Sequence, residues 1–150
     1  PDIVTLAKGL ANGIPIGATI ASEHIGASFE KGDHASTFGG NPVACKAANF
    51  VVDYIIKKGF INNAYVQGNY LLNKLNSIKS KHVKEVRGKG LMIGMEMTDK
   101  DKADNTIKKC IDKGLLINLT AEKVLRFLPP LVIDKKIIDD AVGILREAIG

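Results

Sequence analysis

The stretch TLAKGLANGIPIGA, residues 5–18, is mostly apolar, contains three glycines and one proline, and carries a single charge, Lys8. The β-branched and apolar run DIVTLA (residues 2–7) predicts a short buried strand, and IGATIAS (residues 16–22) predicts a second strand after a glycine–proline turn. Lysine is seldom fully buried. A lysine at the end of a buried strand therefore requires an explanation.

Two explanations of Lys8 follow from its residue type. Burial in an apolar environment disfavours the charged form of an amine, and a neutral amine is a nucleophile toward an aldehyde, as in lysines that form Schiff bases. Alternatively, Lys8 extends to the surface from an edge strand, which is the common behaviour of lysine. The residue pattern alone leaves both explanations open.

The composition predicts a soluble globular protein with one domain or parts of two: 150 residues, 45% hydrophobic and 25% charged. The net charge of +5 is spread along the chain, aromatic residues make up 5% and tryptophan is absent, which argues against binding to nucleic acid. No apolar run is long enough to span a membrane. Cys45 and Cys110 belong to no CxxC pair, which predicts free thiols of a cytosolic protein and no metal site.

The remaining elements follow from helix signals and apolar periodicity. Asn41 and Pro42 predict a helix start, and Lys57-Lys58-Gly59 predicts its end. The composition changes near residue 59, which suggests a domain boundary. Further predicted elements are a helix over 60–79, a strand segment over 83–97, a helix over 103–114, strands over 115–119 and 124–133, and a helix over 134–149. This order predicts an α/β or α+β module. The apolar run at the start of the sequence further suggests part of a longer chain.

The loop HASTFGGNP, residues 34–42, is a candidate anion site. Ser36 and Thr37 offer hydroxyl groups, the following glycines allow backbone amides to approach a ligand, and the helix start adds a positive dipole end. A phosphate would suit this combination. The alternative is an ordinary Ser/Thr/Gly-rich connection.

Arg126, in VLRFLPPL, is a charge flanked by apolar residues. An arginine in such a strand usually has a specific anionic partner, and a guanidinium binds a carboxylate through two hydrogen bonds. An internal ion pair with Glu96 or Glu122 is an equally good explanation. Arg87 lies in a locally basic stretch and is better explained as part of a solvated face.

Four motifs together resemble the class III pyridoxal-phosphate aminotransferases: PDIVTLAKGLANGIPIGA, STFGGNPVACKAA, VRGKGLMIGMEM and VLRFLPPLVI. Their order and spacing agree over nearly the whole chain. The resemblance implies an α/β chain of the PLP-dependent transferase fold type I. Residues 1–58 would be the end of the large cofactor-binding domain, and residues 59–150 the small α/β C-terminal domain.

The resemblance also assigns roles to four residues. Lys8 matches the lysine that holds pyridoxal 5'-phosphate (PLP) as a Schiff base and shuttles the proton. Thr37 matches the residue whose hydroxyl binds the cofactor phosphate across the interface of a homodimer, and Ser36 belongs to the same loop. Arg126 matches the arginine that binds a substrate carboxylate, that of 2-oxoglutarate or glutamate.

Within the family, LLINLTAEKVLRFLPPLVI (residues 115–133) is most similar to members that act on N-acetylornithine in arginine biosynthesis. Members that use ornithine, 4-aminobutyrate or succinylornithine are the alternative. The resemblance implies a cytoplasmic transaminase. The family residues that bind the pyridine ring and most of the phosphate have no counterpart here, so we expect the isolated chain to be inactive. A non-catalytic fragment that needs its upstream half is the remaining alternative.

Overall fold

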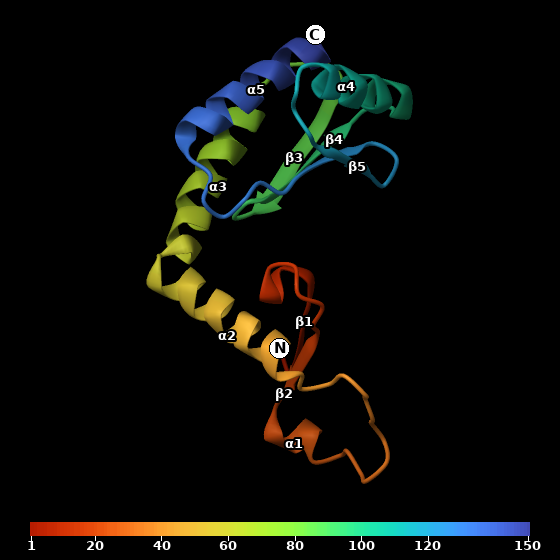
Figure 1. Ribbon diagram of the computed structural model, residues 1–150. Helices are drawn as coiled ribbons and strands as arrows, with labels where there is room; N and C mark the ends of the chain where they lie inside the picture. The colour runs from red at the N-terminus through yellow and green to blue at the C-terminus, as the bar shows by residue number, and fades with distance from the viewer. The chain divides into compact units, whose positions relative to one another are not determined.

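The computed structural model describes all 150 residues, which form two compact units, Pro1–Lys58 and Gly59–Gly150 (Figure 1). The division falls at Gly59, whose φ of +68° is the left-handed conformation that glycine adopts without strain. No helix of the structure combines the length and hydropathy that a membrane crossing requires.

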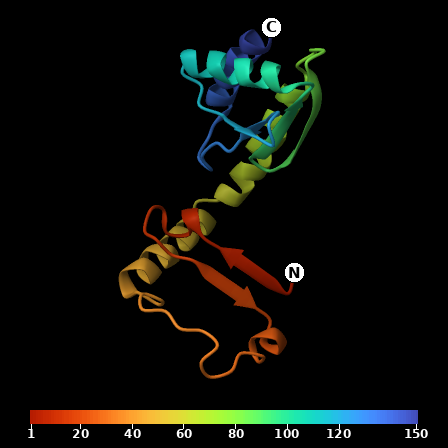
Figure 2. The same cartoon turned by 90° about the vertical axis from the view of Figure 1, so that its right-hand side faces the viewer.

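The first unit begins with a two-stranded antiparallel sheet, β1 (Ile3–Leu6) and β2 (Ala18–Ala21) (Figure 2). The 3-10 helix η1 (Lys8–Ala11) follows β1, and the short helix α1 (Glu23–Gly26) follows β2. Both strands occur where the sequence predicted them. The prediction that the first is buried is wrong for this chain, because all four β1 residues are exposed. A two-stranded sheet is too small to bury its own side chains.

Helix α2 (Pro42–Lys57) confirms the predicted start and end. The Asn41 side chain accepts hydrogen bonds from the backbone N–H groups of Val43 and Ala44, both at 3.1 Å. Pro42 needs no such partner, because it has no N–H. The helix packs against η1, which follows β1 in the same unit.

The second unit is built on a four-stranded antiparallel sheet with the order β3-β4-β6-β5. The strands are β3 (Val83–Lys89), β4 (Met92–Met97), β5 (Asn118–Thr120) and β6 (Val124–Phe127). The single strand segment predicted over 83–97 is in fact a hairpin. Gly90, with φ of +56°, turns the chain between β3 and β4.

Strand β5 begins later than predicted. The backbone N–H of Leu115 donates to the carbonyl of Cys110, so residue 115 still closes the preceding helix instead of joining the sheet. The β5–β6 connection then places Ala121 and Glu122 at φ of +46° and +61°. Both residues have side chains, so this tight turn is strained.

Helices α3 (Phe60–Asn76), α4 (Lys100–Asp112) and α5 (Lys135–Ile149) complete the second unit (Figure 1). The helix predicted over 134–149 is confirmed as α5, and Asp134 caps it, since its carboxylate accepts from the N–H of Ile137 at 2.9 Å. Helix α4 starts earlier than predicted, because Asp99 caps it by accepting from the N–H of Lys102 at 2.7 Å.

The three helices and one face of the sheet enclose the core of the second unit. Helix α3 packs against β3 and β4, α4 against β4, β5 and β6, and α5 against α3 and α4. The largest fully buried side chains of the core are Leu75, Ile93, Met95, Met97, Cys110, Leu125, Ile138, Leu145 and Ile149. Because side chains alternate along a strand, the opposite face of the sheet carries the polar residues.

The glycines of the VRGKGLM motif serve close packing. A Cβ atom on Gly68 of α3 would lie 2.2 Å from the carbonyl oxygen of Gly90. A Cβ atom on Gly88 would lie 2.4 Å from the carbonyl oxygen of Met92. The β3–β4 hairpin can therefore lie against α3 only because Gly68 has no side chain, and β3 can approach β4 this closely only because Gly88 has none.

Candidate active site

Lys8 is the first residue of η1 and has a left-handed backbone, with φ of +54°. Asn12 at the other end of η1 has φ of +48°, a conformation that asparagine tolerates and lysine rarely adopts. Backbone strain of this kind is often found at functional sites. The Lys8 amine has no hydrogen bond or ion pair in this structure, and the residue is exposed. The argument from burial is therefore wrong for this chain, while the amine itself is free to react.

The loop of Ser36 and Thr37 is held by its own hydrogen bonds. The Ser36 hydroxyl oxygen accepts from the N–H of Gly39 at 2.9 Å. A Cβ atom on Gly39 would lie 2.9 Å from the Ser36 Cβ, so this turn requires glycine there. Gly40 follows with φ of +71°. These contacts leave the Thr37 hydroxyl without a partner in the chain, and the Ser36 proton remains available to donate.

The start of α2 contributes less to an anion site than the sequence suggested. Asn41 already satisfies the N–H groups of Val43 and Ala44, and its carbonyl accepts from the N–H of Cys45. Pro42 has no N–H to offer. An anion at this loop would therefore be bound by hydroxyl groups and the loop backbone, with only the dipole of α2 in support.

The Ser36 loop lies beside the segment that follows η1. A cavity of about 220 Å³ is lined by residues 15–17 on one side and by Ser36, Phe38 and the start of α2 on the other. The structure thus brings the glycine–proline turn and the hydroxyl-bearing loop together within the first unit. Lys8 and Thr37 do not line this cavity.

Arg126 belongs to the second unit and lies on the polar face of its sheet. It pairs with Gly94 of β4 on one side and with Asn118 of β5 on the other. It is exposed, although its neighbours Leu125 and Phe127 are buried. Its guanidinium forms no hydrogen bond or ion pair in the structure. The proposed internal ion pair with Glu96 or Glu122 is therefore wrong, and Arg126 is free to bind an external carboxylate.

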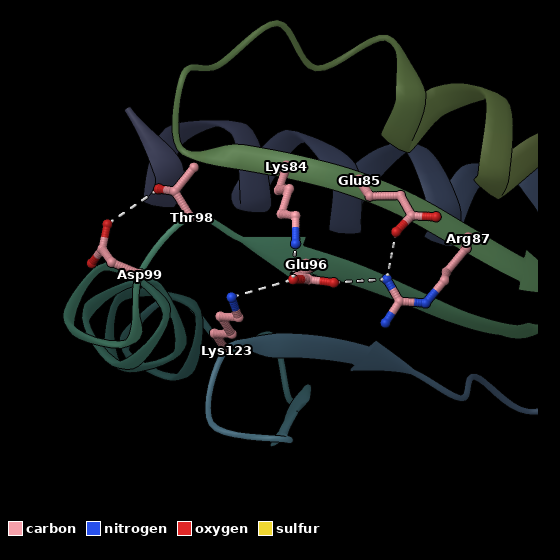
Figure 3. Close-up of polar contacts among 7 residues, drawn as sticks. All are labelled: Lys84, Glu85, Arg87, Glu96, Thr98, Asp99 and Lys123. Atoms are coloured by element: carbon pink, nitrogen blue, oxygen red, sulfur yellow. Dashed lines mark hydrogen bonds and ion pairs between the residues drawn. The ribbon is translucent and has the colours of Figure 1, made fainter.

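Glu96 is engaged elsewhere, in a cluster of charges on the same face (Figure 3). One carboxylate oxygen contacts Lys84 at 2.8 Å and Lys123 at 3.3 Å, and the other contacts Arg87 at 3.1 Å. Hydrogen bonds from Lys84 and then Arg87 lower the pKa of the Glu96 carboxyl to about 2, so it is ionised at neutral pH.

Sequence reasoning missed this cluster. Arg87 does lie on a half-exposed face, as predicted, but it also binds Glu85 at 2.9 Å. A β-bulge between Val83 and Glu85 changes the register there and lets Lys84 reach Glu96. The alternation of charges along β3 and β4 is the signal that could have indicated part of the cluster.

A profile of the class III aminotransferases matches residues 1–149. The chain belongs to the class III aminotransferase family. The membership expected from the four motifs is thus confirmed.

Among the relatives of this class III chain are two acetylornithine aminotransferases, both 48% identical to it. The protein from Caldanaerobacter subterraneus subsp. tengcongensis aligns over 100% of this chain and 38% of its own length. The protein from Aquifex aeolicus aligns over 99% of this chain and 38% of its own length.

Solved structures confirm the α/β PLP-dependent transferase fold. The acetylornithine aminotransferase of Elizabethkingia anophelis superposes with a TM-score of 0.90 at 33% identity, over 99% of this chain and 40% of that one. The ornithine aminotransferase of Toxoplasma gondii superposes with a TM-score of 0.91 at 31% identity, over 99% of this chain and 37% of that one. The chain thus spans about two fifths of the length of these relatives.

Proposed function

We propose that the complete protein containing this chain transfers an amino group between N-acetylornithine and 2-oxoglutarate. The observation that carries this proposal is the 48% identity to acetylornithine aminotransferases over the whole chain. Residues 1–58 would be the last part of the large cofactor-binding domain, and residues 59–150 the small C-terminal domain. The division of the structure at Gly59 supports this assignment.

The donor groups of the first unit suit pyridoxal 5'-phosphate. The cofactor supplies an aldehyde that accepts amines and a ring that withdraws electrons from the substrate carbon. The Lys8 amine, free of any partner, would hold the aldehyde carbon and afterwards move a proton at its Nζ atom. The hydroxyl groups of Thr37 and Ser36 would donate to the phosphate oxygens.

Arg126 would bind the carboxylate of 2-oxoglutarate or glutamate. Its guanidinium forms no ion pair within this chain, so no salt bridge of the chain itself has to break when a carboxylate binds. Arginine is well suited to this task because its planar fork forms two parallel hydrogen bonds to a carboxylate. Arg126 would thereby bind and orient the substrate carboxylate.

We also propose that the protein acts as a cytoplasmic homodimer in arginine biosynthesis. The whole-chain similarity to acetylornithine aminotransferases supports the pathway. Thr37 would then complete the cofactor site of the partner subunit. The exposed ring of Phe38 beside it, 82% exposed, is compatible with a loop that lies at an interface.

Covalent labelling tests the proposal. The complete protein is incubated with pyridoxal 5'-phosphate, reduced with borohydride, digested and examined by mass spectrometry. We expect one labelled peptide, carrying the adduct on Lys8, and no such adduct in Lys8→Ala. Labelling elsewhere, with Lys8 unmodified, would refute the assignment. The isolated 150-residue chain is expected to label weakly and to show no transamination.

Ornithine is the second candidate donor, because ornithine aminotransferases also match the whole chain at TM-scores up to 0.91. A donor screen with the complete enzyme separates the two. We expect kcat/KM to be highest for N-acetylornithine. A clear preference for free ornithine, 4-aminobutyrate or succinylornithine would show that the proposed amino donor is wrong, while the proposed aminotransferase activity would stand.

A further inference from the structure

The connection between β6 and α5, residues 128–133, follows directly after the strand that carries Arg126. Arg126 is the last residue of β6 with a strand partner on both sides, Gly94 of β4 and Asn118 of β5. Phe127, which ends the strand, is paired with β4 alone. Secondary-structure elements open most readily at their ends. The position of Arg126 therefore also depends on how the connection holds the end of β6.

Two prolines make this connection stiff and poor in hydrogen-bond donors. Pro129 and Pro130 have no backbone N–H, and their rings fix φ. A residue that precedes a proline is confined to extended backbone as well, so residues 128–130 have few alternative conformations. Within the connection, the N–H of Ile133 donates to the carbonyl of Pro130 at 3.0 Å. A stiff segment of this kind passes a displacement at one end on to the other.

Asn63, in the first turn of α3, holds the far end of the connection. The connection runs beside α3 (Figure 1), and the Nδ2 atom of Asn63 donates to the carbonyl of Leu131 at 2.7 Å and to that of Ile133 at 3.1 Å. An amide nitrogen carries two N–H groups, so both hydrogen bonds can form at once. All of these residues belong to the second unit, Gly59–Gly150, so the contacts are internal to it.

We propose that Asn63 is a positioning residue for substrate binding. By holding the β6–α5 connection, it keeps Arg126 where the guanidinium meets the substrate carboxylate. This inference rests on the proposed function, in which Arg126 binds 2-oxoglutarate or glutamate. Asn63 does not touch the substrate in this scheme, and it acts through the backbone that joins the connection to β6.

The consequence of removing the Asn63 amide follows from these contacts. The carbonyls of Leu131 and Ile133 would lose their donor, and the connection would shift relative to α3. Arg126 would then spend less time in the geometry that binds a carboxylate through two parallel hydrogen bonds. A loss of binding that is equal in the ground state and the transition state raises KM and leaves kcat unchanged.

The test is steady-state kinetics of the complete enzyme. Asn63→Leu removes both donors at similar side-chain volume. We expect its KM for 2-oxoglutarate to rise about three- to tenfold with kcat nearly unchanged, less than the roughly hundredfold effect of a full 1 Å misplacement. Asn62→Leu is the matched control, because Asn62 also lies in the first turn of α3, is exposed and forms no side-chain hydrogen bond in the structure. Its KM should equal that of the wild type.

A double variant distinguishes a positioning role from a merely structural one. Arg126→Lys keeps the charge but loses the planar fork, so it should raise the KM for 2-oxoglutarate while leaving activity measurable. If Asn63 acts through Arg126, adding Asn63→Leu to Arg126→Lys should raise the KM by a smaller factor than it does in the wild type. Melting temperatures show whether each variant is folded. Should Asn63→Leu fail to fold, Asn63→Ala, which favours the helix, performs the same test.

Two outcomes would overturn the inference: an unchanged KM in Asn63→Leu, or a rise in KM by the same factor with and without Arg126→Lys. Arg126→Lys alone separates this failure from that of the proposed function. If it raises the KM for 2-oxoglutarate, the role of Arg126 stands and only the inference about Asn63 fails. If it leaves the KM unchanged, Arg126 does not bind the substrate, and its role in the proposed function fails as well.

Discussion

Replacing Gly68 by alanine should destabilise the second unit, because its α-carbon faces the backbone of the β3–β4 turn. The new Cβ atom would lie 2.2 Å from the oxygen, 2.3 Å from the carbonyl carbon and 2.7 Å from the α-carbon of Gly90. Ordinary carbon contacts are about 3.5–4.0 Å. The turn would have to move by more than about 1 Å from α3, and no flexible side chain is there to yield.

The magnitude follows from a comparison with Gly143→Ala. Gly143 is also inside a helix, α5, but a Cβ atom there meets nothing within 4 Å. Both substitutions gain up to about 1 kcal/mol of helix propensity. That gain cancels between the two variants, and the difference is the cost of overpacking, typically about 1–3 kcal/mol. Because the clash involves backbone atoms, we expect a value near 3 kcal/mol.

Urea unfolding of the 150-residue chain, followed by far-ultraviolet circular dichroism, measures this difference. We expect Gly143→Ala to raise the free energy of unfolding and Gly68→Ala to lower it. Equal stability of the two variants would refute the reasoning, because it would mean that α3 and the hairpin do not approach as closely as described.

Three further predictions concern other parts of the chain. Lys8→Ala in the complete enzyme should abolish transamination while leaving the circular dichroism spectrum unchanged; residual activity above the uncatalysed rate would contradict its role. Glu122→Gly should raise the free energy of unfolding by about 0.5–1 kcal/mol, because glycine relieves the left-handed strain at φ of +61°, and a loss of stability in urea unfolding would disprove this. The pKa of Glu96 is lowered from 4.5 to about 2 on folding, so its contribution to stability is complete above pH 4.5 and is lost as the pH falls toward 2. Urea titrations at pH 5 and pH 3 should accordingly show a smaller pH effect in Glu96→Gln than in the wild type, and an identical pH effect would count against the charge cluster.

The helix ends could be predicted because their signals are local. Asn41 before Pro42 and Asp134 before the last amphipathic stretch accept hydrogen bonds from N–H groups two or three residues ahead, so neighbouring residues settle the outcome. The family, likewise, could be recognised from four short motifs whose order and spacing are read directly from the chain.

Other features depend on distant residues, and the sequence did not reveal them. The turn at Gly90 lies against Gly68 of α3, a residue far away in the sequence. The charge cluster depends on three cations, two from β3 and one from the β5–β6 turn, that all contact Glu96 of β4. The burial predicted for β1 would need neighbours that a two-stranded sheet does not have.

The self-contained start of α2 has a thermodynamic consequence. Since Asn41 satisfies the first N–H groups of the helix, α2 does not require an anion in order to form. Folding of α2 and binding of the proposed cofactor phosphate are then two independent equilibria, each with its own free energy. Without a bound cofactor, α2 should therefore remain helical. Loss of the cofactor phosphate would leave the Ser36 and Thr37 hydroxyl groups without a ligand but would not unfold the helix.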